Sequence, residues 1–216
     1  MKKSLNQLLY GFNTIFWDFD GVIKDSIEVK NIAFEELFSG CDKKTLVAIK
    51  NHHLKNSGLS RFEKIPIYLS WTCKSLSSKN IEKYCKQFSV LVKNSVINSP
   101  WVPGIRAYLK SNYKHKKFII ITATPENEIV EILKELSIHH YFLAVYGSPI
   151  SKINAISDSI MRFKIEEENA IMIGDSQIDC EAAVKNNIFF ALRQTKHNLP
   201  LQKSLDCFKF QDFNDE

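Results

Sequence analysis

The sequence predicts an α/β protein in two parts: a Rossmann-like three-layer core with a mainly parallel sheet, and an all-helical cap inserted after the first strand. Three observations support this prediction. Strand-like and helix-like segments alternate from residue 104 onward, as in parallel sheets with right-handed crossovers. Residues 28–98 show only helix-like spacing of apolar residues. The strand-like segment at residues 13–19 has no neighbouring strand within this helical block, so we expect it to pair with strands of the later sheet.

We therefore assign residues 1–25 and 100–216 to the core and residues 26–99 to the cap. The first strand is NTIFWDF (13–19), which is apolar and ends at Asp18. The cap helices are expected in EVKNIAFEELF (28–38), DKKTLVAIKNHHL (42–54), RFEKIPIYLSWTCKSL (61–76) and NIEKYCKQFSVLVKNSV (80–96). Two prolines and a glycine in NSPWVPG (98–104) end this block. The linkers around residues 24–27 and 98–103 are the candidate hinges.

The second half alternates between the two kinds of element. Helices are expected in residues 104–113, 125–136, 152–163 and 177–187, and strands in residues 117–123, 142–147, 169–174 and 188–192. The tail LDCFKFQDFNDE (205–216) is a candidate for a short edge strand.

Composition indicates an ordinary globular protein. Its 216 residues are 44% hydrophobic and 25% charged, which allows a substantial core. The net charge of +5 suits an anionic small molecule, and no dense basic stripe with interleaved aromatics indicates nucleic acid. Five cysteines without CxxC spacing suggest reduced, mostly buried thiols. No stretch is long enough to span a membrane, and we expect a cytoplasmic protein.

Polar residues gather where predicted strands and crossovers end. They are Asp18 and Asp20 after the first strand, Thr122, Ala123 and Thr124 after the second, Lys152 after the third, and Asp175 and Asp179 after the fourth. Each residue alone has an ordinary explanation as a turn, cap or solvated side chain. Because parallel strands bring their carboxyl ends to one edge, the set together indicates a ligand site.

The residue types complement one another chemically. Asp18, Asp20 and Asp175 are hard oxygen ligands suited to Mg²⁺, which would also offset their mutual repulsion. Thr124 and Pro125 are expected to cap and begin a helix, so that Thr122 and nearby backbone N–H groups form an anion cradle. Lys152 adds a positive charge suited to a phosphate.

These segments resemble the four motifs of the haloacid dehalogenase-like hydrolase superfamily. DFDGVIKDS resembles the first motif, IIITAT the second, Lys152 within GSPISK the third, and IMIGDSQID the fourth. The resemblance covers residues 12–192. A helical insertion between the first two motifs is similar to the phosphoglycolate phosphatase and β-phosphoglucomutase branch.

The resemblance implies a role for each matched residue. Asp18 would be the nucleophile that becomes an aspartyl-phosphate, and Asp20 the general acid and base. Mg²⁺ would be held by Asp18, by the backbone carbonyl of Asp20 and by Asp175, with Asp179 acting through water or from farther out. The transferring phosphoryl group would be held by Thr122, Ala123 and Lys152. The implied function is that of a magnesium-dependent phosphatase acting on a small phosphorylated metabolite, either a sugar phosphate or an organic-acid phosphate.

Alternatives stay open at this stage. Asp20 favours phosphoryl transfer, because dehalogenases lack an aspartate at that place. GLSRFEK (58–64) resembles a β-phosphoglucomutase cap stretch and makes Arg61 a candidate substrate residue. Lys30 stands where those mutases carry a histidine, and Val22 replaces the branch's usual threonine, so hydrolysis is favoured. A Schiff-base phosphonate-cleaving enzyme is weakly excluded. Two alternatives of another functional class also stay open: a signalling receiver domain, and a catalytically silent relative that serves as a binding protein.

The sequence does not identify the substrate or the oligomeric state. The cap offers several candidate substrate-binding side chains without a ranking: Lys30, His52, His53, Arg61 and Lys64. The two adjacent histidines are expected to be solvated or to cap a helix.

Overall fold

The computed structural model describes residues 4–72 and 74–214. Its core is a six-stranded sheet in the order β3-β2-β1-β4-β5-β6, and every pair of neighbours is parallel. The strands are β1 (Thr14–Trp17), β2 (Lys117–Pro125), β3 (Ala144–Ser148), β4 (Ala170–Gly174), β5 (Phe189–Arg193) and β6 (Phe208–Phe210). The predicted parallel sheet is confirmed. Strand β1 lies inside the sheet between β2 and β4, and the tail supplies the edge strand.

Helices cover both faces of the sheet, which makes the three layers that the sequence predicts. Alternate residues of β1 point to opposite faces, so that Ile15 and Trp17 join one hydrophobic cluster while Phe16 joins the other. The first face packs against α1 (Leu5–Tyr10), α6 (Ile105–Asn112) and α7 (Glu126–Glu135), and the second against α8 (Lys152–Phe163) and α9 (Gln177–Lys185). Outside the stretch between β1 and α6, the remaining described elements are α10 (Leu199–Ser204) and the 3₁₀ helices His139–Tyr141 and Glu167–Asn169.

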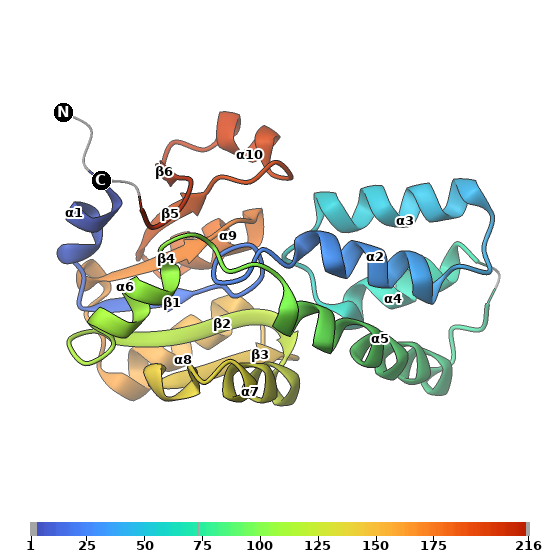
Figure 1. The fold of residues 1–216 in the computed structure, drawn as a ribbon, viewed down its shortest axis with the longest axis horizontal. Coiled ribbons are helices and arrows are strands. Elements are labelled where there is room, and N and C mark those ends of the chain that lie inside the picture. The colour runs from blue at the N-terminus through green and yellow to red at the C-terminus, as the bar shows by residue number, and fades with distance from the viewer. Residues whose placement is uncertain (1–3, 73, 215–216) are drawn as a thin grey trace.

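Four helices lie between β1 and α6 in the chain. They are α2 (Ile27–Leu37), α3 (Lys43–Lys55), α4 (Arg61–Ser70) and α5 (Ser78–Asn98). Figure 1 shows them gathered beyond one end of the sheet, on the right of the view. Aromatic rings fill the space between them: Phe34 stacks on Phe88 with 4.0 Å between ring centroids and meets Tyr68 edge-on at 5.2 Å. We call these helices and their loops the cap; the exact boundaries at residues 26 and 99 stay a prediction.

The two chain segments that join cap and core run side by side. The N–H of Asp25 donates to the carbonyl of Pro100, and the N–H of Val102 donates to that of Ile23. The ammonium of Lys24 donates to the carbonyl of Ile97 at 3.0 Å and lies over the ring of Trp101. Because the linkers are bonded to each other, a movement of the cap would carry both together.

One expectation about the cysteines is wrong. Cys41, Cys180 and Cys207 are only half-buried, Cys85 alone among the described cysteines is buried, and these four are free thiols. Cys73 lies outside the described residues.

Within the described chain, none of the helices has the length and apolar character needed to cross a bilayer.

Candidate active site

The site begins at the carboxyl end of β1. Asp18 directly follows the strand, is buried, and accepts a hydrogen bond at Oδ1 from the N–H of Phe19 at 2.8 Å. Its own N–H donates to the carbonyl of Ile173 in β4 at 2.9 Å. Gly21 follows with a φ of +80°, and a Cβ at this position would collide with the carboxylate of Asp175. The tight turn therefore needs glycine, because it brings the first loop against the fourth.

Three carboxylates come together behind Asp18. Oxygens of Asp18, Asp175 and Asp179 lie within 4.8 Å of one another, and all three residues are buried. Burial raises the pKa of Asp18 to about 7, although the charge of Lys152 opposes this shift. Burial and the charges of Asp18 and Asp179 raise the pKa of Asp175 well above its usual value. The cluster therefore holds more negative charge than its surroundings stabilise.

This donor set fits a divalent cation. Carboxylate oxygens are what Mg²⁺ prefers, and the lysine beside them balances only part of their charge. The side chain of Asp20 is not part of the cluster found among the described residues. The use of its backbone carbonyl as a metal ligand stays a prediction, and its carboxylate has other partners.

Lys152 lies between two of these carboxylates. It is the first residue of α8, and its ammonium lies 3.0 Å from Oδ1 of Asp18 and donates to Oδ1 of Asp179 at 2.6 Å. Burial lowers the pKa of Lys152, but the two carboxylates outweigh burial and the net shift is upward. Lys152 is therefore a fixed positive charge beside the candidate nucleophile.

Asp179 has a structural task that the sequence motif does not reveal. Its Oδ2 accepts hydrogen bonds from the N–H of Ser176 at 3.1 Å and from its hydroxyl at 2.6 Å. These contacts cap the start of α9. With Lys152 on the other oxygen, both oxygens of Asp179 are already engaged.

The end of β2 differs from the expected helix cap. The strand continues to Pro125, which is itself the N-cap of α7, and Thr124 does not cap the helix. The hydroxyl of Thr124 instead donates to Oδ2 of Asp20 at 3.1 Å and accepts from Lys30 at 2.9 Å. Thr122 keeps the expected position: it is buried, it lines the cavity with Ala123, and its hydroxyl accepts the N–H of Thr124 at 3.2 Å.

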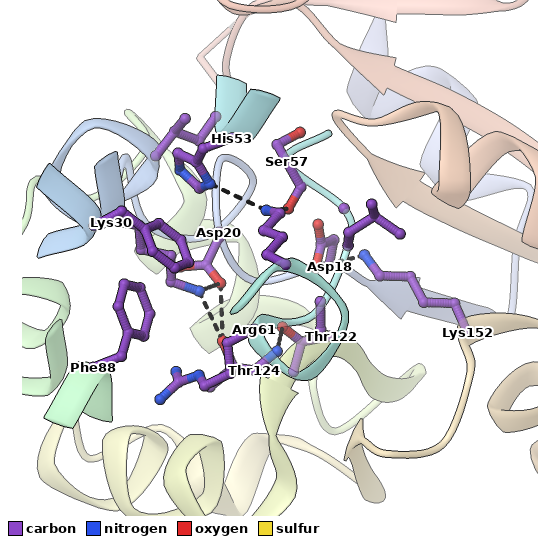
Figure 2. Close-up of a pocket in the computed structure, with 16 residues that line it drawn as sticks. Asp18, Asp20, Lys30, His53, Ser57, Arg61, Phe88, Thr122, Thr124 and Lys152 are labelled. Carbon is purple, nitrogen blue, oxygen red and sulfur yellow. Dashed lines mark hydrogen bonds and ion pairs between the residues drawn. The ribbon is translucent and has the colours of Figure 1, made fainter. Parts of the chain in front are cut away.

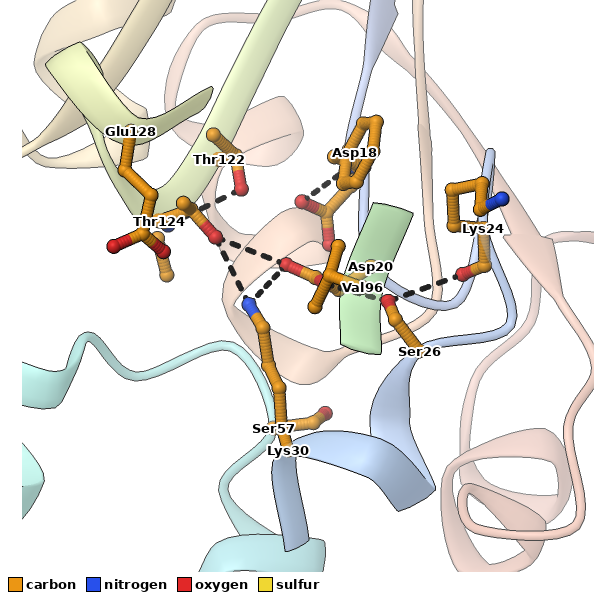
Figure 3. Close-up of polar contacts among 12 residues, drawn as sticks. Asp18, Asp20, Lys24, Ser26, Lys30, Ser57, Val96, Thr122, Thr124 and Glu128 are labelled. Carbon is orange, nitrogen blue, oxygen red and sulfur yellow. Dashed lines mark hydrogen bonds and ion pairs between the residues drawn. The ribbon is translucent and has the colours of Figure 1, made fainter. Parts of the chain in front are cut away.

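Asp20 points toward the cap rather than into the carboxylate cluster. Oδ1 accepts from the hydroxyl of Ser26, and Oδ2 is paired with the ammonium of Lys30 in α2 (Figure 3). Burial raises the pKa of Asp20, but the charge and hydrogen bonds of Lys30, together with Ser26 and Thr124, outweigh burial and lower it. In this arrangement Asp20 is an ionised carboxylate placed on the cap side of Asp18.

Cap and core together enclose a small cavity. Figure 2 shows its lining: Asp18, Asp20, Thr122, Thr124 and Lys152 from the core, and Lys30, His53, Ser57, Arg61 and Phe88 from the cap. Its free volume is about 30 Å³, which is room for a water molecule or two. A second cavity of about 400 Å³ adjoins it and shares Thr122, Ala123 and Lys152. The cap is therefore closed over the candidate nucleophile.

Arg61, the candidate substrate residue, lines this cavity but is already bonded. Its guanidinium donates to the carboxylate of Glu128 in α7 through Nη1 at 2.8 Å and Nη2 at 2.5 Å, and also to the hydroxyl of Ser89. From the sequence, Glu128 is only one of the residues of the helix expected over residues 125–136. The sequence could not show that a cap arginine is the partner of Glu128, because the two residues lie 67 positions apart.

Two further residues are placed differently from expectation or were missed. His53 is buried rather than solvated, because α3 packs it against the ring of Phe34. Asn198 was not singled out, although its side-chain amide donates to the carbonyls of Asp175 and Arg193, each at 2.8 Å. No local motif marks Asn198, because it acts on a loop 23 positions earlier in the chain.

The comparisons with known proteins agree with this geometry. A sequence model described as haloacid dehalogenase-like hydrolase matches residues 15–192. The structure is similar to a predicted phosphoglycolate phosphatase from Haemophilus somnus 129pt, with a TM-score of 0.77 and 18% identity over 94% of this chain and 95% of the other. It is also similar to β-phosphoglucomutase from Clostridium difficile, with a TM-score of 0.73 and 19% identity over 94% and 92% of the chains. No curated protein matches the sequence.

Proposed function

Because the chain belongs to the haloacid dehalogenase-like hydrolase family, we propose that it is a magnesium-dependent phosphatase that hydrolyses a small phosphorylated metabolite through an aspartyl-phosphate. The observation that most supports this proposal is the arrangement around Asp18. A buried carboxylate at a strand end has Lys152 beside it, Thr122 in the same cavity, and a separate carboxylate, Asp20, on the cap side. Nucleophile, charge-stabilising groups and acid–base group are thereby present together.

In the first half-reaction, Asp18 attacks phosphorus and the bond between phosphorus and the leaving oxygen breaks. Asp20 is ionised while Lys30 is paired with it, so it takes up a proton when the cap opens and Lys30 withdraws, and then gives this proton to the leaving oxygen, which departs as an alcohol. In the second half-reaction, a water molecule attacks phosphorus while Asp20 takes a proton from this water. The bond between phosphorus and the carboxylate oxygen of Asp18 breaks, and inorganic phosphate is released. The contacts of Asp20 with Lys30, Ser26 and Thr124 favour the ionised form that this second half-reaction needs.

Mg²⁺ would be held by Asp18 and Asp175, with the backbone carbonyl of Asp20 nearby, and would neutralise negative charge on the phosphoryl oxygens. Thr122 and the backbone of Ala123 would orient the phosphoryl group, and Lys152 would stabilise the charge that develops on it. Removal of one such preorganised group commonly costs a hundredfold or more in rate.

The cap has to open for turnover. No phosphate ester fits a free volume of about 30 Å³, and Lys30, Arg61 and Lys64 of the cap line this cavity together with Asp18. We propose that the cap swings on the paired linkers to admit substrate and closes to exclude bulk water during phosphoryl transfer.

A phosphosugar mutase is the second candidate, and the contacts of Arg61 bear on the choice between the two. A mutase of this kind would use Arg61 to hold a second phosphate. Here a buried carboxylate, Glu128, already neutralises this arginine, so a second phosphate would have to displace it. This pairing favours hydrolysis of a monophosphate, and Arg61 stays a proposed substrate residue only for substrates that displace Glu128.

The test is phosphate release from p-nitrophenyl phosphate with Mg²⁺, compared with the same reaction after chelation and with Asp18→Asn. Turnover that is lost in both controls supports the proposed phosphatase. If turnover survives in Asp18→Asn, the aspartyl-phosphate is wrong. If nothing turns over, and beryllium fluoride and Mg²⁺ do not bind the wild-type protein either, phosphoryl transfer itself is wrong. Phosphosugar isomerisation faster than phosphate release would favour the mutase.

A further inference from the structure

Four cationic side chains line the cavity above Asp18, and three of them have a carboxylate partner. Lys30 is paired with Asp20, Arg61 with Glu128, and Lys152 with Asp18 and Asp179. The fourth, Lys64 in α4, has no carboxylate within salt-bridge distance among the described residues. Lys64 is therefore the one cation of this cavity whose charge the described protein leaves unbalanced.

The surroundings of Lys64 are neutral. The residue is 2% exposed, and its ammonium lies 3.1 Å from Nδ1 of His53 and 3.4 Å from the carbonyl of Ser57. Burial and the charge of Lys64 hold the pKa of His53 well below its usual value, so the imidazole is uncharged and accepts the hydrogen bond. The carbonyl contact is long for a hydrogen bond. At least one N–H of the ammonium is left without a close acceptor.

Such a position is costly without a counter-ion. An ammonium taken out of water loses its solvation free energy, which a paired charge and good hydrogen bonds are needed to restore. Consistently, burial and the nearby charge of Lys30 lower the pKa of Lys64 to about 7. An anion bound in the cavity would supply the missing partner.

We propose that Lys64 binds a carboxylate on the leaving group, so that the substrate is a phosphorylated organic acid rather than a neutral sugar phosphate. This inference rests on the proposed phosphatase function and narrows its substrate class. The transferring phosphoryl group belongs at Asp18, Thr122 and Lys152, on the core wall of the cavity. Lys64 comes from the cap wall and is left to contact the remainder of the substrate.

A carboxylate fits this position better than a second phosphate. A phosphate dianion is usually held by several charge-assisted donors, often a bidentate arginine. The arginine in this cavity has both of its terminal nitrogens on Glu128 and Ser89. One ammonium with a neutral imidazole behind it matches a single negative charge.

The experiment compares two phosphate esters that differ only at the relevant group: 3-phosphoglycerate, with a carboxylate, and glycerol 3-phosphate, with a hydroxymethyl group in its place. Binding is measured calorimetrically with Mg²⁺ in the Asp18→Asn protein, with and without Lys64→Met. Loss of one charged partner of a carboxylate is expected to weaken 3-phosphoglycerate about tenfold or more and glycerol 3-phosphate less than about threefold. Lys55→Met, at the exposed end of α3, is the matched control and should change neither affinity.

Equal weakening of both esters would mean a structural role for Lys64 and would overturn the proposal. No weakening of either, or no binding of either, would place the leaving group elsewhere, for example in the adjoining 400 Å³ cavity, and would also overturn it. Tighter binding of glycerol 1,3-bisphosphate than of 3-phosphoglycerate would overturn the assignment to a carboxylate. If p-nitrophenyl phosphate is not hydrolysed while the Lys64-dependent preference in binding persists, the phosphatase function fails and the carboxylate site stands.

Discussion

Arg61 of the cap and Glu128 of the core form a two-pronged ion pair across the interface between the two parts. Both residues are buried, at 4% and 8% exposure, and the guanidinium also lies over the ring of Phe88 at 4.7 Å. Lys93 in α5 pairs with Glu131 one turn farther along α7, but that pair is solvent-exposed. Of these two pairs, only Arg61 with Glu128 would leave an uncompensated buried charge if one partner were lost.

Glu128→Gln is expected to open the cap. A buried pair that loses one partner costs about 3–5 kcal/mol while the interface stays shut, so opening becomes the easier response. Amide exchange in residues 56–60 and in the part of α5 that faces α7 should rise about tenfold or more, while the aromatic interior of the cap stays protected. The measurement is hydrogen–deuterium exchange by mass spectrometry.

Glu131→Gln is the matched control for this change. It removes a similar ion pair from the same helix, but an exposed pair contributes about 0–1 kcal/mol, so exchange should barely change. Equal exchange in the two variants would show that the buried pair does not hold the cap.

Gly58→Ala is expected to hinder closure without harming the fold. Gly58 lies in the cap loop before α4, and a Cβ there would lie 2.5 Å from Oγ of Ser176 and 3.2 Å from Cβ of Ile178, both in the core. If the substrate complex needs the same closure, kcat should fall about tenfold, which corresponds to about 1.4 kcal/mol.

Steady-state kinetics with an aryl phosphate and thermal unfolding check this prediction. Gly40→Ala is the control, since no atom lies within 4 Å of the added Cβ. A normal kcat in Gly58→Ala would mean that this loop does not approach the core during turnover.

Asn198→Leu is expected to weaken metal binding. The amide of Asn198 ties the carbonyl of Asp175 to the carbonyl of Arg193, so it fixes the loop that carries one of the proposed metal ligands. Groups that support metal ligands in this way typically contribute about 10–100-fold in metal affinity or activity. Titration of activity with Mg²⁺ should show a higher half-saturating concentration but a kcat that largely recovers at saturation. An unchanged Mg²⁺ dependence would contradict this role.

Mg²⁺ is expected to stabilise the protein more at high pH than at low pH. Burial raises the pKa of Asp18 from 3.8 to about 7, and burial with the charges of Asp18 and Asp179 raises the pKa of Asp175 well above its usual value, so the metal-free folded protein holds protons that the unfolded chain releases. Metal-free stability should therefore fall as the pH rises from about 4 through about 7. Because Mg²⁺ needs the ionised carboxylates, its binding expels these protons.

Thermal unfolding with Mg²⁺ or with a chelator measures the effect. At about a hundred times the dissociation constant, Mg²⁺ should add about 2.7 kcal/mol, or roughly 5–10 °C in Tm, near pH 8 and much less near pH 5.5. Asp175→Asn should abolish the shift. A shift of the same size at both pH values, or one that persists in Asp175→Asn, would argue against a metal held by these carboxylates.

Patterns along the chain predicted the elements well where their period is strong. Local patterns correctly predicted the apolar strands β1, β2 and β4 and the helices within residues 28–98. Tertiary packing buries the same apolar residues that these patterns mark. The short helix α1 was missed because six residues hold too little periodicity, although Ser4 and Gln7 form a capping box there. The prediction that Thr124 caps a helix was wrong because its hydroxyl forms hydrogen bonds with the charged side chains of Asp20 and Lys30 instead.

The sequence by itself determined the fold class, the order of the motifs and the edge of the sheet where Asp18, Thr122, Lys152 and Asp175 gather. It could do so because the direction of parallel strands places their carboxyl ends together whatever the intervening chain. Only the tertiary structure decided which charges are paired. Arg61 with Glu128, Lys30 with Asp20, and Lys64 with a neutral histidine are contacts between different segments, and the partners lie 67, 10 and 11 positions apart. Each contact requires an approach of a few ångströms that no spacing along the chain encodes, because it depends on how the cap helices pack on one another and on the core.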